Sequence, residues 1–137
     1  MRKLDQRGVA ALEFCLVAGA FFLVVFAIFD LGRYAITMQS LRHLAGAGAR
    51  VIMINCYTDA AIAKQSPTSC SGDPLSTSEK QNVAPFLFGG GLSPTLNAAG
   101  SSPIVVTASQ PGFTMLMPIW GTAFNAPHAS TNIPSPI

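Results

Sequence analysis

The sequence predicts an α+β fold, in which a long N-terminal helix carries a small C-terminal domain containing a β-hairpin. Residues 9–29 are almost continuously apolar and residues 30–52 contain no proline, which together favour one long helix. Farther along, residues 104–107 and 113–119 are rich in Val, Ile, Phe and Met, and the turn residues Gln110-Pro111-Gly112 separate them. Because an isolated hairpin is marginal in water, we expect it to pack on the outer half of the helix.

The composition points to lipid or to neighbouring subunits as the surroundings of this chain. Its 137 residues suffice for one small domain and an anchor, half of them are apolar, and only 10% are charged. An ordinary globular protein carries about 25% charged residues. The net charge is only +2, so the sequence does not indicate a basic surface for nucleic acid.

Residues 9–29 have the length of a transmembrane helix, because about 1.5 Å of rise per residue spans a hydrocarbon core of about 30 Å. Basic residues precede this run (Arg2, Lys3 and Arg7), which predicts a cytoplasmic N-terminus and an extracytoplasmic C-terminal domain. A cleaved secretory signal is the alternative. We favour the anchor because a signal's apolar core is about 7–15 residues long and ends at small residues.

The helix is expected to continue outside the membrane over residues 30–53. Asp30 and Arg33 are spaced i, i+3, so they can form an ion pair where the helix leaves the membrane. The small residues at 45–49 either let helices approach closely or weaken the helix locally. His43 is expected to be a solvent or contact residue. One small domain cannot cover so long a rod, which therefore requires lipid or other helices.

The C-terminal domain is expected over residues 54–125, followed by an extended tail over residues 126–137. Cys56 and Cys70 can close a disulfide loop, worth about 3 kcal/mol in the chain-entropy model, in an oxidising compartment. Cys15 is expected to be a small apolar residue of the anchor.

Local signals predict further features of this domain. Ser76-Thr77-Ser78-Glu79 fits a capping box, which predicts a short helix ended by Pro85. Gly89-Gly90-Gly91 predicts a flexible break. Trp120 and Phe124 are expected to cover the contact between hairpin and helix, and Met115 and Met117 to lie in the strand core.

Glu13 is the most informative residue, because a charged side chain inside a membrane helix costs about 2.5–3.5 kcal/mol. It either reaches the interface or is protonated, or else it has a positive partner at the same depth. A cut after Gly8 would create that partner, because Val9 would then carry a free α-amino group. In a bundle, Glu13 of one subunit would pair with the Val9 amine of its neighbour and set their register.

The residues around Glu13 resemble a known signal. Arg7-Gly8-Val9-Ala10-Ala11-Leu12-Glu13-Phe14 is similar to the class III prepilin signal of type IV pilins. With Asp30-Leu31-Gly32-Arg33 and Ala45-Gly46-Ala47-Gly48-Ala49-Arg50, the first fifty-three residues or so resemble the TadE-like family, the minor pilins or pseudopilins of the tight-adherence (Flp) pilus. Phe14 departs from the Tyr that Flp-type pilins commonly have.

The resemblance implies a structural subunit of the bacterial inner membrane that takes part in assembling a pilus used in adhesion. Residues 1–8 would be a leader, removed between Gly8 and Val9 by a prepilin peptidase. Further partners would be membrane lipid, other pilin subunits through helix packing, and the inner-membrane assembly platform. Major Flp pilins are much shorter than this chain, which favours a minor subunit.

Other functions have less support from the sequence. No nucleophile, base and orienting group occur together, so we do not expect an enzyme or a cofactor. His43 and His128 do not combine with the cysteines at the spacing of a zinc site. Two alternatives remain: a membrane-anchored periplasmic binding or adhesion module, and a pseudopilin of a related secretion system.

Overall fold

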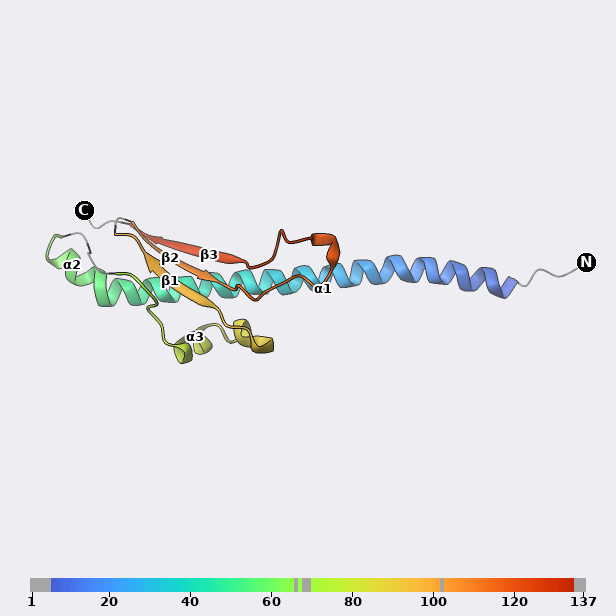
Figure 1. Cartoon of the computed structure of the whole chain (residues 1–137), viewed down its shortest axis with the longest axis horizontal. Helices are drawn as coiled ribbons and strands as arrows, with labels where there is room; N and C mark the ends of the chain where they lie inside the picture. The colour runs from blue at the N-terminus through green and yellow to red at the C-terminus, as the bar shows by residue number, and fades with distance from the viewer. Residues whose placement is uncertain (1–5, 66, 68–69, 102, 135–137) are drawn as a thin grey trace, which may run out of the picture.

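One long helix forms the axis of the molecule (Figure 1). A computed structural model describes residues 6–65, 67, 70–101 and 103–134. Helix α1 covers Gln6–Ile52, and a π-helical turn, η1 (Met53–Tyr57), leads into the short helix α2 (Thr58–Ile62). The expected long helix is confirmed, and it continues past residue 53. Its N-terminal half projects from the domain, which packs along the C-terminal half.

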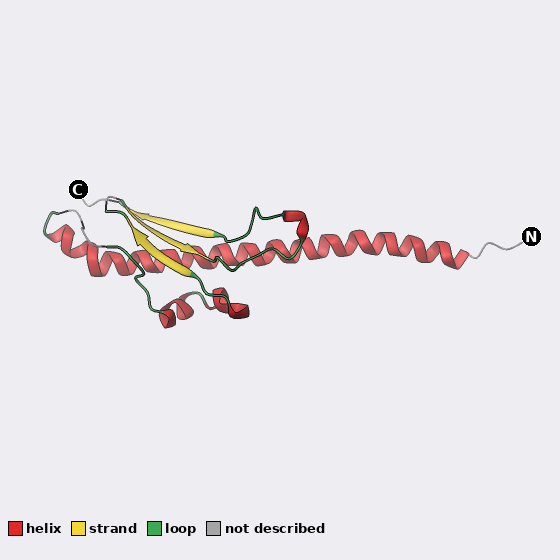
Figure 2. Cartoon of the chain, in the orientation of Figure 1, coloured by secondary structure: helices red, strands yellow, loops and turns green. Residues whose placement is uncertain are grey.

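A three-stranded antiparallel sheet lies along the outer half of α1 (Figure 2). Its strands are β1 (Thr95–Ala99), β2 (Ile104–Ser109) and β3 (His128–Ile133), in the order β1-β2-β3. Val106 in the central strand lies opposite Ala98 of β1 and Thr131 of β3. The α+β fold class is therefore confirmed.

The predicted partner of β2 was wrong. Residues 113–119 form an irregular loop that runs into the short 3-10 helix η3 (Pro118–Trp120), and β2 pairs instead with β3. The extended tail expected over residues 126–137 is wrong over the residues of β3, and residues 135–137 lie outside the described part. The sequence pattern did not predict strand β3, because polar side chains separate its two buried apolar side chains, Ala129 and Ile133.

The sheet packs closely on α1 because small residues line the contact. Ala45 and Ala49 are buried in the core, and Gly48 lies between them on the same face. A Cβ atom on Gly48 would lie 2.9 Å from Leu96 Cδ2 and 3.2 Å from Val106 Cγ1. The small-residue stretch therefore allows the chain's own sheet, rather than a second helix, to approach this face.

The segment between helix and sheet is held by a disulfide between Cys56 and Cys70, whose Cα atoms are 5.9 Å apart. Helix α3 (Thr77–Val83) begins with the predicted capping box: the Ser76 N–H donates to Glu79 Oε2 at 2.8 Å. Helix α3 ends before Pro85, as expected, and the 3-10 helix η2 (Pro85–Gly91) follows. The predicted glycine break coincides with the kink inside η2.

Candidate functional site

The N-terminal half of α1 is an uncovered apolar rod. The most apolar window of this helix has a mean hydropathy of 2.6, and none of it is buried. Large apolar side chains are exposed along its length, among them Phe14, at 72% exposure, and Phe29, at 68%. By length and composition, the helix can cross a membrane, which is consistent with the expected anchor.

Glu13 interrupts this rod one helical turn after Val9. Residues spaced i, i+4 lie on the same helix face, and both Val9 and Glu13 are exposed. Within the described residues, Glu13 forms no ion pair. Of the leader expected over residues 1–8, residues 1–5 lie outside the described part, and residues 6–8 belong to the first turn of α1.

Gly8 has no structural role in the described chain. A Cβ atom added to Gly8 would meet no other atom within 4 Å, in contrast to the crowded Gly48. A larger residue would therefore fit at position 8 and would also be a better helix former.

Asp30, the first residue after the apolar run, joins the helix to the distant β2–β3 loop. Its carboxylate is 1% exposed, and it accepts hydrogen bonds from the backbone N–H groups of Leu116, at 3.1 Å, and Met117, at 3.0 Å. Arg33 Nη1 lies 3.4 Å from Asp30 Oδ1. The sequence suggested the partner at i+3 but gave no signal for the two backbone donors, which come from 86 and 87 residues away.

The environment of Asp30 favours its charged form. Burial raises the pKa of this carboxyl group, but the Met117 and Leu116 N–H groups and the Arg33 guanidinium together lower the pKa below its ordinary value of 3.8. A carboxylate that accepts several hydrogen bonds is a strong attachment point. Asp30 therefore holds the loop against the helix.

Aromatic side chains cover the same region of α1. The Tyr34 ring lies 5.0 Å from Phe124 and 6.3 Å from Phe113, and Trp120 lies 5.8 Å from Phe124. The Arg33 guanidinium carbon lies 5.3 Å from the centre of the Phe113 ring, in a cation–π contact. Phe124 thus covers the helix as expected, and Trp120 packs behind it.

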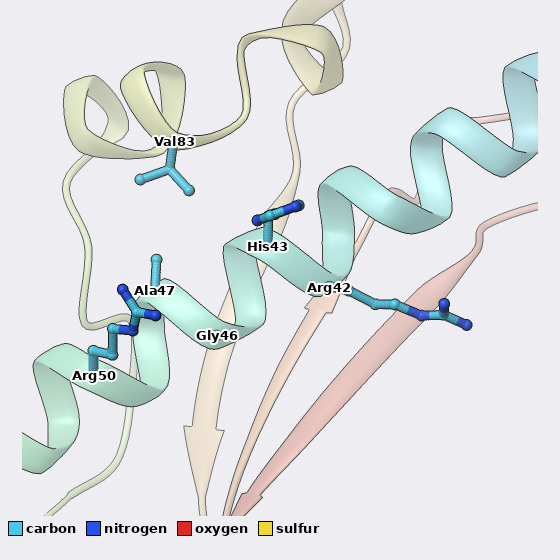
Figure 3. A pocket seen from close by; sticks show the side chains of 6 residues that line it. All are labelled: Arg42, His43, Gly46, Ala47, Arg50 and Val83. Atoms are coloured by element: carbon cyan, nitrogen blue, oxygen red, sulfur yellow. The ribbon is translucent and has the colours of Figure 1, made fainter.

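A cleft of about 400 Å³ between α1 and α3 is lined by basic side chains (Figure 3). His43 and Arg50 lie on the side of α1 that faces Val83, whereas the Arg42 side chain extends away from it. In the described part of the chain, neither arginine forms an ion pair. The cleft therefore carries positive charge that no acid in the described residues neutralises.

The described residues contain no group of three or more His, Cys, Asp or Glu side chains that could hold a metal ion. Cys15 is an exposed free thiol on the apolar rod.

Comparison with known proteins gives one match. The family described as "TadE-like protein" matches residues 8–50, which contain Gly8, Val9, Glu13, Asp30 and Arg33. No curated protein matches the chain, and no solved structure does. The family match confirms, over residues 8–50, the resemblance to the TadE-like family found in the sequence.

Proposed function

We propose, taking the match of residues 8–50 to the TadE-like family as the premise, that this protein is a structural minor pilin or pseudopilin. It is processed by a prepilin peptidase and takes part in assembling a Tad/Flp-type pilus used in adhesion. The observation that carries the proposal is the exposed apolar rod with a single acid, Glu13, one turn after Val9.

Processing between Gly8 and Val9 gives the glycine a role that the fold does not supply. Position 8 is open, so neither packing nor a special backbone conformation requires glycine there. A peptidase that accepts no side chain at this position does require it. The cut leaves a free α-amino group on Val9, which can carry a positive charge.

The new amine and Glu13 then form a charge pair between subunits. A rise of about 1.5 Å per residue places Glu13 about 6 Å along the axis from Val9. A neighbouring helix displaced by about one turn brings its Val9 amine level with Glu13. Two charges that are costly in lipid thereby become a pair that sets the stagger of the helices.

The remaining features fit an anchored subunit with its domain outside the cytoplasm. We propose that residues 9–29 span the bacterial inner membrane, with the N-terminus cytoplasmic and the domain periplasmic. The disulfide between Cys56 and Cys70 suits that compartment. Lipid surrounds the rod before assembly, and other pilin subunits and the assembly platform take the place of lipid during assembly. The role of the protein is structural rather than catalytic.

A neutral substitution at Glu13 tests the charge pair. Glu13→Gln keeps the shape but removes the charge, so we expect normal membrane insertion and processing but little protein in sheared pili. Asp59→Asn, which removes an exposed acid of α2, is the matched control and should assemble normally. Normal recovery of Glu13→Gln in the pilus fraction would refute the pairing.

A second candidate, a membrane-anchored periplasmic binding module, draws support from another cleft. This cleft of about 490 Å³ lies between α1, η2 and the β2–β3 loop, and Arg33 and Gln110 line it. The buried Gln110 Oε1 has no hydrogen-bond partner among the described residues. Such a module would retain residues 1–8. A pseudopilin of a related secretion system would instead be cut and would copurify with secretion components.

A further inference from the structure

The β2–β3 loop turns back beside the point where α1 leaves its apolar run. Residues 114–120, here called the exit loop, contain the two N–H groups that bind Asp30. Figure 1 shows that the turn carrying η3 is the part of the domain nearest to the exposed N-terminal half of α1. The exit loop therefore lies at the height along the helix where the proposed span ends.

The exit loop presents apolar side chains that the chain itself does not cover. Leu116 is 74% exposed and Ile119 is 56% exposed, next to the partly buried Trp120. The sequence after residue 100 contains no Asp, Glu, Lys or Arg. On the helix, Ile28 and Phe29 at the end of the apolar run are 65% and 68% exposed, so both the rod and the loop expose apolar side chains at this level.

We propose that the exit loop is a second membrane contact, in which Leu116, Ile119 and Trp120 enter the outer boundary between lipid headgroups and acyl chains. This inference rests on the proposal that residues 9–29 span the membrane, because that span fixes the height of the loop. Tryptophan and exposed aliphatic side chains suit this boundary, which is apolar on one side and wet on the other.

Asp30 makes this contact effective because it joins the loop rigidly to the span. Its carboxylate binds the backbone of Leu116 and Met117, so the loop cannot move away without losing these charge-assisted hydrogen bonds. A helix alone leaves the domain free to tilt and rotate. If the exit loop also contacts the membrane, beside the helix axis, the domain can no longer rotate about the helix, and one fixed face of the domain lies toward the membrane.

The single tryptophan of the chain provides the test. The full-length protein is reconstituted in phosphatidylcholine vesicles, and Trp120 emission is compared in lipids brominated near the headgroup end or the methyl end of the acyl chains. We expect a marked loss of emission with the first lipid and a smaller loss with the second. Equal emission in brominated and unbrominated vesicles would overturn the proposal.

Substitutions show whether the apolar side chains cause the contact. The double substitution Leu116→Asp with Ile119→Asp should abolish most of the quenching, whereas Ile62→Asp, at an equally exposed site on α2, should not change it. An intact Cys56–Cys70 disulfide and an unchanged near-ultraviolet circular dichroism spectrum confirm folding. Quenching that persists in the folded double variant would contradict the inference.

A tryptophan in the rod separates this inference from the anchor on which it rests. Phe22→Trp, combined with Trp120→Phe, places the fluorophore in the middle of the proposed span, where lipids brominated near the methyl end should quench it most. If this variant is quenched and Trp120 is not, the exit loop has no lipid contact and the span stands. If neither is quenched, the anchor itself fails.

Discussion

At the residue scale, two carboxylates mark the proposed span, because Glu13 lies one helical turn inside it and Asp30 directly follows it. Glu13 has no ion-pair partner among the described residues, and Asp30 has three polar partners at 3.0–3.4 Å. Both acids stand out in the sequence, because Glu13 lies within the apolar run and Asp30 lies at its edge. Only the local partner Arg33 could be predicted for Asp30, because the N–H donors depend on how the β2–β3 loop folds back.

The lowered pKa of Asp30 predicts a pH-dependent stability. Because its pKa is lower in the folded chain than the ordinary 3.8, Asp30 stabilises the fold above about pH 4, and this contribution is lost as the pH falls through the folded-state pKa. In Asp30→Asn, an amide cannot accept both N–H groups equally well, so we expect a loss of about 1–3 kcal/mol at neutral pH.

Thermal unfolding in detergent, followed by Trp120 fluorescence, measures this effect. The difference in midpoint between the parent chain and Asp30→Asn should be constant from pH 7 to about pH 4 and should shrink below that. The pKa of Glu79 is also lowered, by hydrogen bonds from Ser76, but Glu79 is present in both proteins and cancels in the difference. A difference that does not change with pH would contradict the assigned role of Asp30.

At the element scale, α1 and α3 could be predicted from the sequence, but α2 and the pairing of the strands could not. The apolar run and the capping box of α3 are local signals, and both led to the correct element. The error concerned residues 113–119, which are apolar enough to resemble a strand. Their apolar side chains include the exposed Leu116 and Ile119, whereas the mainly polar β3 completes the sheet. Strand choice depends on long-range packing that no short window contains.

The contact between α1 and the sheet yields a paired prediction for two glycines of one helix. Gly46→Ala should stabilise the domain by up to about 1 kcal/mol, because no atom lies near the new Cβ and alanine favours the helix. Gly48→Ala should destabilise it by about 1–3 kcal/mol, because its Cβ would overlap the buried Leu96 and crowd Val106.

Chemical unfolding of the two variants side by side measures the difference, since both change the same residue type two positions apart. Equal shifts of the two midpoints would show that Gly48 is not at a tight helix–sheet contact.

At the scale of the whole molecule, the chain combines a covered half and an uncovered half on one helix. The outer half of α1 is buried by the sheet, and the inner half exposes apolar side chains that need lipid or other subunits. The family match covers the uncovered half from residue 8 onward, continues over most of the covered half, and ends before the sheet begins. We therefore infer that the rod performs the assembly and the domain determines what this subunit adds to it.

The most direct test of this account is the intact mass of the protein purified from its native membrane, together with N-terminal sequencing. The account predicts a mature chain that begins at Val9 and lacks residues 1–8, and it predicts that Gly8→Val keeps its full length. A native protein that still carries residues 1–8 would contradict the account. The chain would then be an anchored extracytoplasmic module, and the charge of Glu13 would have no partner amine.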